Sequence, residues 1–261
     1  MALNDGGKSL KRMFLAEFRR GFRSGGLYLG AVLLATMTLI GTTDIIGTLR
    51  EYRILQEEVR CISFLYQVTY SDIFCYLIPI VCTLAMSASY QEDLQSGIYK
   101  YILVRTSVKS YKWSKVLNCA IYGILTAFLA LILICIGSVV IFPVNHEEME
   151  ILHKLTAKYY FSIILRVVLI FLNSSFYAVF GALAAAITKN RYMAYAAPFI
   201  FNYVISMLAS AYLYGYPVLN PKEWLANTMI RSATCLKIMV LVNIIVIIVF
   251  AHQIGRDEYY E

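Results

Sequence analysis

The chain has 261 residues, of which 60% are hydrophobic and only 15% are charged, and its formal net charge is +7. Soluble domains have about 25% charged residues and a smaller apolar share, so this composition excludes an ordinary soluble domain. Stretches of about 18 or more nearly uncharged residues recur, and each can cross about 30 Å of hydrocarbon as a helix. We therefore expect an all-α membrane protein.

The first predicted element is a basic amphipathic helix within residues 1–25. Apolar and basic side chains recur on separate faces at three- and four-residue steps: Leu10, Met13, Phe14, Phe18 and Phe22 on one, and Lys8, Arg12, Arg19 and Arg23 on the other. A helix of this kind lies at the level of the lipid head groups, on the cytoplasmic side. The alternative is a loose basic leader. We expect no cleavage as a signal peptide, because the charged leader is long and the first apolar run lacks a small-residue exit.

Six transmembrane helices are predicted after this interfacial helix, within residues 26–252. Their expected bounds are Gly26–Thr48, Ile73–Tyr90, Ser114–Phe142, Phe161–Ile187, Tyr192–Tyr214 and Thr234–His252. Pro79 and Pro198 interrupt the second and fifth spans and permit bends there. A cytoplasmic tail, residues 253–261, follows the last span.

The distribution of basic residues predicts the orientation. The N-terminal arm, residues 91–115, residues 189–191 and the tail contain 14 of the 23 Lys and Arg residues. Cytoplasmic loops of membrane proteins carry such an excess. The chain is therefore expected in the cytoplasmic (inner) membrane with both termini inside. The net charge then reflects orientation and attraction to anionic membrane lipids, with no nucleic acid needed as a partner.

The loop before the last span, residues 214–233, is too apolar for a free loop. We expect it to fold back against the outer leaflet as one or two short helices that bury Trp224, Leu225 and Met229. Asn220 is expected to cap a helix that has Pro221 at its first position.

No catalytic constellation is visible, so we do not expect an enzyme, and we expect no cofactor bound by this chain. Gly6–Ser9 has the last four residues of a phosphate-binding loop, but Ala2 stands where that motif needs glycine and no strand precedes it. His146, Glu150 and His153 have a spacing that could hold a metal, although side chains on an acidic outer loop are more often solvated. We expect no metal site.

The six cysteines are interpreted as buried apolar thiols or as one possible pair. Cys75, Cys82, Cys119 and Cys135 fall inside spans and are expected to be buried. The remaining two, Cys61 and Cys235, lie near the outer face, and the sequence leaves open whether they form a disulfide.

Polar side chains inside the spans are mostly neutral. Asn173 and Ser174 in the fourth span, Asn202 in the fifth and Asn243 in the sixth could join helices by hydrogen bonds or line a translocation path. Arg166 lies near an outer end, where it could snorkel to water.

A charged segment, residues 91–115, separates the second and third spans. Tyr90, Leu94, Ile98, Tyr101 and Ile102 predict one helix along the inner membrane interface. Two acidic residues, Glu92 and Asp93, suit the N-terminal end of that helix. Its other face would then offer charge to a cytoplasmic partner.

This segment resembles the one that follows the second span in permeases of the type-2 family of ATP-binding-cassette (ABC) exporters. That pattern has Glu, then Gly about five residues later, a Leu-x-Arg-Pro turn, and a Tyr and a Lys that enter the third span. The matching residues here are Glu92, Gly97, Leu103, Arg105, Tyr111 and Lys115. Thr106 stands where proline is usual.

The resemblance implies an ABC transporter permease, the transmembrane subunit of an exporter of peptides or other amphiphilic compounds. Its coupling helix would dock on separate cytoplasmic ABC ATPase subunits, which bind ATP and Mg. A second permease, identical or related, would complete the transporter. The expected ATPase-coupling residues are Glu92, Asp93, Gly97, Arg105, Tyr111 and Lys115. The alternatives are a secondary transporter or channel subunit that works without an ATPase, and an intramembrane enzyme or assembly factor.

Overall fold

The computed structural model describes residues 3–51, 60–143, 157–226 and 228–257, and throughout these ranges every regular element is helical. The helices, in chain order, are α1 (Leu3–Arg23), α2 (Gly25–Gly41), α3 (Thr43–Glu51), α4 (Arg60–Tyr70), α5 (Asp72–Val81), α6 (Ser89–Gln95), α7 (Ile98–Arg105), α8 (Val108–Ile141), α10 (Ala157–Thr188), α11 (Met193–Tyr212), the 3₁₀ helix η1 (Pro217–Leu219), α12 (Pro221–Ala226) and α13 (Ser232–Asp257).

Four helices of the described part are long and apolar enough to cross a membrane: Val108–Ile141, Tyr160–Thr188, Met193–Tyr212 and Ser232–Arg256. Two bent pairs also qualify when each pair is counted as one span. These pairs are α1 with α2, bent by 53°, and α4 with α5, bent by 66°. The chain is therefore a multi-pass membrane protein with four to six candidate spans in its described part.

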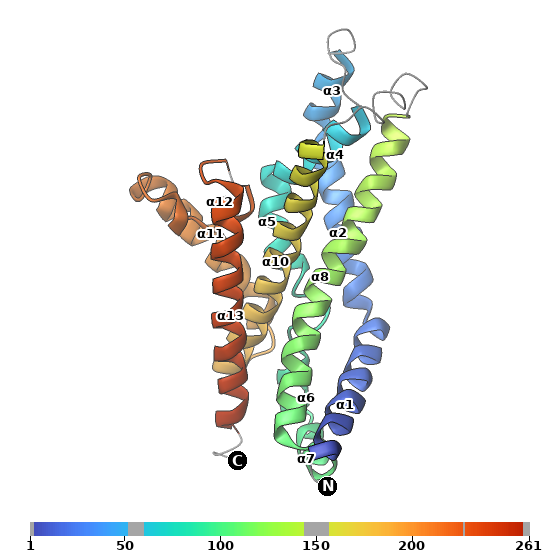
Figure 1. Cartoon of the computed structure of the whole chain (residues 1–261), viewed down its shortest axis with the longest axis vertical. Helices are drawn as coiled ribbons and strands as arrows, with labels where there is room; N and C mark the ends of the chain where they lie inside the picture. Colours follow the sequence, from blue (N-terminus) through green and yellow to red (C-terminus); the bar gives the residue numbers. More distant parts are fainter. Residues whose placement is uncertain (1–2, 52–59, 144–156, 227, 258–261) are drawn as a thin grey trace.

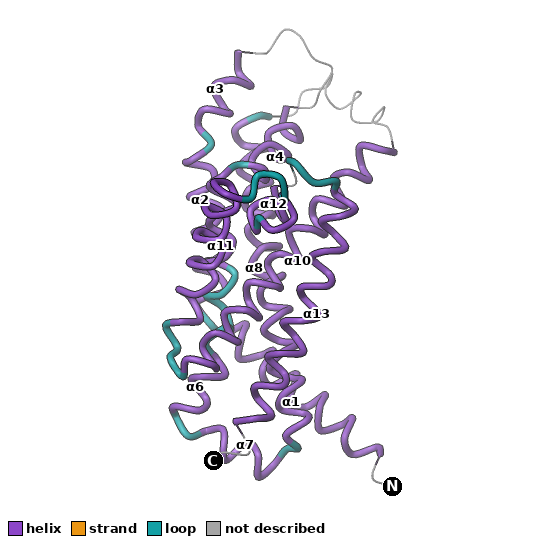
Figure 2. Tube along the Cα trace, turned by 90° about the vertical axis from the view of Figure 1, so that its left-hand side faces the viewer, coloured by secondary structure: helices purple, strands orange, loops and turns teal. Residues whose placement is uncertain are grey.

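The helices form an elongated bundle with two distinct ends (Figure 1). The start of α1, the short helices α6 and α7, and the end of α13 lie at one end, which we call the basic end. The elements α3 and α12 lie toward the opposite end (Figure 1). Helix α8 has 34 residues and is therefore about 50 Å long, enough to run along most of the bundle. Figure 2 shows α1 slanting away from the long axis of the bundle.

Two predicted spans are not continuous helices. The first, predicted over Gly26–Thr48, breaks at Thr42, where α2 ends and α3 begins. The second, predicted over Ile73–Tyr90, is helical only as far as Val81, and residues 82–88 form a series of turns before α6. The interior Pro79 cannot donate a helical backbone hydrogen bond, and the helix ends two residues after it.

The turn segment 82–88 can remain irregular because protein surrounds it. Ser87 Oγ donates to the carbonyl oxygen of Ala178 in α10 at 2.8 Å, and Ser24 Oγ donates to that of Ala85 at 3.1 Å. Irregular backbone at membrane depth is tolerated only where its polar groups find partners inside the protein. The break therefore sits between α2 and α10.

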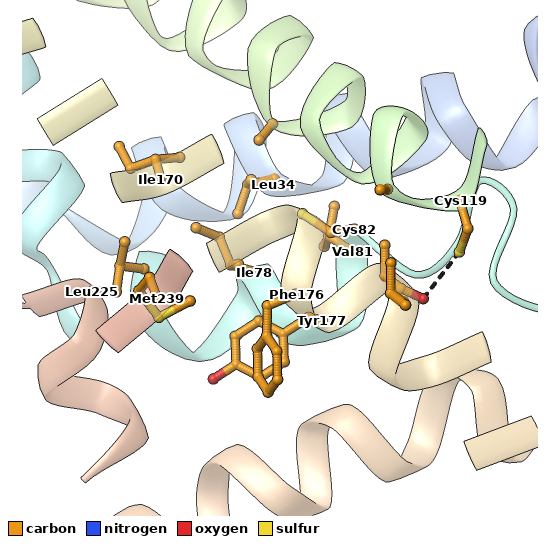
Figure 3. Close-up of a cluster of buried hydrophobic side chains, with 14 of the residues drawn as sticks. Leu34, Ile78, Val81, Cys82, Cys119, Ile170, Phe176, Tyr177, Leu225 and Met239 are labelled. Carbon is orange, nitrogen blue, oxygen red and sulfur yellow. Dashed lines mark hydrogen bonds between the residues drawn. The ribbon is translucent and has the colours of Figure 1, made fainter. Parts of the chain in front are cut away.

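The hydrophobic core is centred on α10, which packs against α5, α8, α11 and α13. Tyr177 and Phe176 of α10 lie at its centre with Ile78 and Val81 of α5 (Figure 3). The Sγ of Cys119 donates to the carbonyl oxygen of Ala178 at 3.1 Å, the contact drawn as a dashed line in Figure 3. These contacts fix α8 against α10.

The cysteines follow the prediction in part. Cys75, Cys82 and Cys119 are buried free thiols as expected, whereas Cys135 is exposed, because it lines an open apolar groove between α4, α8 and α10. The possible disulfide does not form. Cys61 Sγ instead lies 3.4 Å from the Ser138 hydroxyl, and Cys235 Sγ contacts the backbone carbonyl of Glu223.

The loop before α13 folds into short helices as predicted. The side-chain oxygen of Asn220 accepts a hydrogen bond from the backbone N–H of Lys222 at 3.1 Å, and Pro221 is the first residue of α12. Trp224 and Leu225 are buried within the chain, whereas Met229 is 55% exposed on its surface, so the predicted burial of Met229 against the membrane or a partner stays a prediction. Trp224 packs edge-on against Phe176, which anchors α12 to α10.

Arg166 does not snorkel to water but is enclosed, with 4% of its surface exposed. Its guanidinium donates to the backbone carbonyls of Thr69 and Leu225 and stacks 3.8 Å from the ring of Tyr70. Thr69 and Leu225 lie in the last turns of α4 and α12, where carbonyl groups lack helical partners and the helix dipole favours a cation. Arg166 therefore ties two helix ends to α10.

Candidate functional site

The charged segment, residues 91–115, includes two short helices, α6 and α7, which a turn joins at the basic end. The sequence predicts one helix, but α6 ends at Gln95 and α7 begins at Ile98. Between them Gly97 has φ of 71°, a left-handed conformation that glycine adopts without strain. A β-carbon on Gly97 would meet no heavy atom within 4 Å, so glycine is needed here for its backbone and not for space inside this chain.

A closed arrangement of four charges joins α6 to α1 and α8. Lys115 Nζ lies 2.6 Å from Asp93 Oδ2 and 2.8 Å from Glu17 Oε2. Arg20 Nη1 lies 2.5 Å from Asp93 Oδ1 and 3.9 Å from Glu17 Oε1. We call Glu17, Arg20, Asp93 and Lys115 the charge ring. It holds two acidic and two basic side chains, one pair opposite the other, and its formal charge is zero.

Three members of the charge ring are enclosed by protein. The exposed fractions of the Asp93, Lys115 and Glu17 side chains are 0%, 1% and 5%, and that of Arg20 is 40%. Burial by itself would raise the pKa of Asp93, but the charges of Lys115 and Arg20 and their hydrogen bonds outweigh it and lower that pKa. Asp93 is therefore an anion at neutral pH.

Aromatic side chains surround the charge ring on the side of α6 and α7. Tyr111 Oη donates to Asp93 Oδ2 at 2.9 Å. The Tyr111 ring packs against those of Tyr90 and Tyr99, and Tyr90 also contacts Phe250 near the end of α13. Helix α6 is therefore joined to α8 by charge and to α13 by packing.

The outer side of α7 carries an apolar stripe that the described part of the chain leaves uncovered. Ile98, Tyr101 and Val104 are spaced three residues apart and are 48%, 77% and 86% exposed. Residues three apart lie on one helix face. Of the stripe predicted over this segment, Tyr90 is buried while Ile98 and Tyr101 face outward, because the break at Gly97 rotates α7 relative to α6.

The structure brings together four of the six predicted coupling residues. Asp93, Tyr111 and Lys115 are in mutual contact, and Glu92 joins them through Arg20 at 3.4 Å. Gly97 forms the turn beyond them. The sixth, Arg105, ends α7, and its side chain lies outside the described residues.

Glu17 and Arg20 were missed by the sequence interpretation. The signal for Glu17 is a carboxylate four residues after Met13 and three after Phe14, inside the apolar face of α1. An acidic residue on a face that packs against α8 needs a cationic partner from the facing helix. Lys115 is that partner.

The four residues predicted for a translocation path are all buried, and three of them contact a neighbouring helix. Asn243 Nδ2 donates to the carbonyl oxygen of Leu172 at 3.0 Å, and Asn202 Oδ1 accepts from Tyr177 Oη at 2.7 Å. Asn173 Nδ2 contacts Met239 Sδ at 3.7 Å, and Ser174 Oγ donates to the carbonyl oxygen of Ile170 within α10. These contacts link α10 to α11 and α13.

Among the described residues, no cluster of three or more His, Cys, Asp or Glu side chains is placed to hold a metal ion. His146, Glu150 and His153 lie outside the described residues.

Comparisons of the chain with protein families, with curated proteins and with solved structures find no match.

Proposed function

We propose that this chain is the transmembrane permease subunit of an ATP-driven exporter and that α7 is the docking helix for a separate cytoplasmic ATPase. The observation that carries the proposal is the uncovered apolar stripe of Ile98, Tyr101 and Val104 on α7. Such a stripe on a short helix among basic residues suits insertion into a groove of a soluble partner.

The charge ring supports this role because it makes α6 and α7 a mechanical link. A force on α7 passes through Gly97 to α6, and from Asp93 to Lys115 at the start of the long helix α8. Packed interiors transmit strain between discrete arrangements and do not deform gradually. A docked subunit that moves α7 would therefore move α8 and, through Glu17, α1.

The division of labour also agrees with the sequence. Gly6–Ser9 does not complete a phosphate-binding motif, so ATP and Mg would be held by the partner subunits. A second permease, identical or related, would complete the path, and the exported compound would be a peptide or another amphiphile. The basic end would face the cytoplasm, with both termini inside.

The experiment compares the wild type with Tyr101→Asp and with Tyr216→Asp as a matched control. Tyr216 is 68% exposed and lies beyond α11, near the opposite end of the bundle. Affinity-purified complexes are assayed for ATP hydrolysis, and a photo-crosslinking residue at position 101 identifies the attached polypeptide by mass spectrometry.

We expect ATPase activity to co-purify with the wild type and with Tyr216→Asp, and to fall at least tenfold with Tyr101→Asp. We also expect the crosslinked polypeptide to contain nucleotide-binding motifs. Buried apolar anchors at interfaces commonly contribute 2 kcal/mol or more, which corresponds to roughly 30-fold in affinity. Equal activity in all three samples would contradict the docking role of α7. Transport by the purified chain alone would favour the secondary-transporter alternative.

A further inference from the structure

A polar cavity of about 650 Å³ opens beside α1, on the side away from α8. Arg19, Arg20 and Arg23 of α1 form one wall, the turn segment 82–88 forms the back, and Glu92 and Tyr195 stand across from the arginines. Tyr195 belongs to the start of α11. The cavity is thus built from four separate parts of the chain.

The cavity has an excess of positive charge. Arg20 is neutralised by Asp93 at 2.5 Å and by Glu92 at 3.4 Å. Arg19 and Arg23, in contrast, have no ion-pair partner among the described residues. Two guanidinium groups therefore remain for a ligand. Arginine binds phosphate oxygens through paired N–H donors, and the phenol of Tyr195 is a further donor on the facing wall.

The level of the cavity along the bundle indicates the kind of anion. α2 begins directly after Arg23 and Ser24, and its exposed face is apolar: Tyr28, Leu29 and Val32 are each more than half exposed. Apolar side chains that face outward on a span contact acyl chains, and basic side chains beside them lie at the head groups. The cavity is therefore placed where a phosphate on a lipid would enter, with its acyl chains beside α2.

We propose that this cavity binds the phosphate head group of an anionic phospholipid from the adjacent leaflet. The site rests only on the cavity and its charges, so it does not depend on the ATPase proposal. It has a consequence for the charge ring, because Arg20 belongs to both. A phosphate in the cavity competes with Asp93 for Arg20 and so acts on the contact between α1 and α6.

The test is lipid binding by the purified chain, measured by native mass spectrometry after addition of dioleoylphosphatidylglycerol or dioleoylphosphatidylcholine. The variant Arg19→Gln/Arg23→Gln removes the two unpaired cations of the cavity. The control, Lys11→Gln/Arg12→Gln, removes the same charge from exposed positions on α1 that do not line it.

We expect the wild type and the control to bind phosphatidylglycerol more tightly than phosphatidylcholine. The cavity variant should lose roughly 30-fold in that affinity, from about fivefold for each arginine near an anionic lipid. If it does not fold, the single variants Arg19→Gln and Arg23→Gln, each expected to bind about fivefold more weakly, replace it.

Three results would overturn the proposal. If the cavity variant and the control lose the same affinity for phosphatidylglycerol, the lipid is held only by diffuse attraction to a basic helix. Equal affinity for the two lipids would show that the head group is not recognised. Displacement of the lipid by millimolar inorganic phosphate would identify a site for a free anion, whereas we expect the lipid to stay bound because its chains contribute.

Discussion

Lys115 and Asp93 form an ion pair of 2.6 Å inside the protein, with 1% and 0% of their side chains exposed. Asp93 lies in α6 and Lys115 in α8, on either side of α7 in the sequence. Arg20 and Glu17 of α1 form further ion pairs with them. Charges removed from water are costly unless each one is paired and hydrogen-bonded. The pair therefore fixes where α6 lies against α8, and the first prediction follows from it.

Replacing Lys115 by methionine should leave Asp93 and Glu17 buried without their shared cation. We expect a loss of about 3–5 kcal/mol in the free energy of unfolding, the usual cost of breaking a buried pair from one side. Lys109→Met, at an exposed position of the same helix, should change it by less than about 0.5 kcal/mol. Thermal unfolding of the detergent-solubilised chain measures both, and similar values for the two variants would argue against the charge ring as a structural element.

The pH dependence of stability should follow the lowered pKa of Asp93. A carboxyl group whose folded-state pKa is depressed contributes stability above its unfolded pKa, which is about 3.9 for Asp. That contribution is lost only as the pH falls through the lower folded-state value. We expect the gap in unfolding temperature between the wild type and Asp93→Asn to be constant from about pH 8 to pH 5 and to narrow below about pH 4. A gap that changes near neutral pH would contradict this assignment.

Gly26 and Gly25 provide a matched test of the broken second span. A β-carbon at Gly26 would lie 2.1 Å from the backbone oxygen of Leu84, whereas one at Gly25 would meet no atom within 4 Å. Gly26→Ala should therefore push α2 away from the turn segment 82–88, at a cost of about 1–3 kcal/mol. Gly25→Ala should be nearly neutral. The unfolding temperatures of Gly26→Ala and Gly25→Ala measure this difference. Equal values for the two variants would mean that α2 does not approach that segment closely.

Gly97 should tolerate substitution poorly for a different reason. Its φ of 71° costs an L-residue roughly 1–2 kcal/mol, although space is available around it. Gly97→Ala should therefore destabilise the turn between α6 and α7 by that amount, and Gly97→Asn by less. Gly47→Ala, in the open interior of α3, should be neutral or slightly stabilising. Hydrogen exchange of α6 and α7 reports the difference, and unchanged exchange in Gly97→Ala would exclude the left-handed turn.

The two ends of the bundle should face opposite sides of the membrane. In a variant without its native cysteines, a cysteine at Tyr216 should react with an impermeant thiol reagent in intact cells. A cysteine at Tyr101 should react only after the cells are opened. Both positions are well exposed in this chain. Because the proposed partner would cover Tyr101, that partner is removed from the opened cells before the reagent is added. Labelling at Tyr101 alone in intact cells would reverse the proposed orientation and remove α7 from the cytoplasm.

Local features of the chain could be predicted from the sequence because they depend on neighbouring residues. Long apolar runs require a multi-pass helical protein, since only helices and closed barrels satisfy backbone groups in hydrocarbon. The short helix α12 followed from Asn220 and Pro221, whose side chains act within one turn. The basic residues of α1 predicted a helix in the same way.

The breaks in the helices were decided by tertiary contacts. Nothing in residues 82–88 excludes a helix by propensity alone. That segment forms turns because Ser24 and Ala178 supply hydrogen-bond partners that a regular helix would supply internally. Gly26, which has no side chain, lets α2 approach these turns closely. These two hydrogen bonds join residues that are 61 and 91 positions apart in the sequence. Local periodicity cannot predict them, because it describes one helix at a time.

The candidate site divides in the same manner. The sequence by itself determined that Glu92, Asp93, Tyr111 and Lys115 lie in one charged segment between spans. Only the tertiary structure decided that Asp93 and Lys115 turn inward and that Glu17 and Arg20 of α1 meet them. A charge in a polar segment can stay in water or enter a buried pair, and the pair forms only where a partner offsets the cost of desolvation. The position of that partner depends on how distant helices pack.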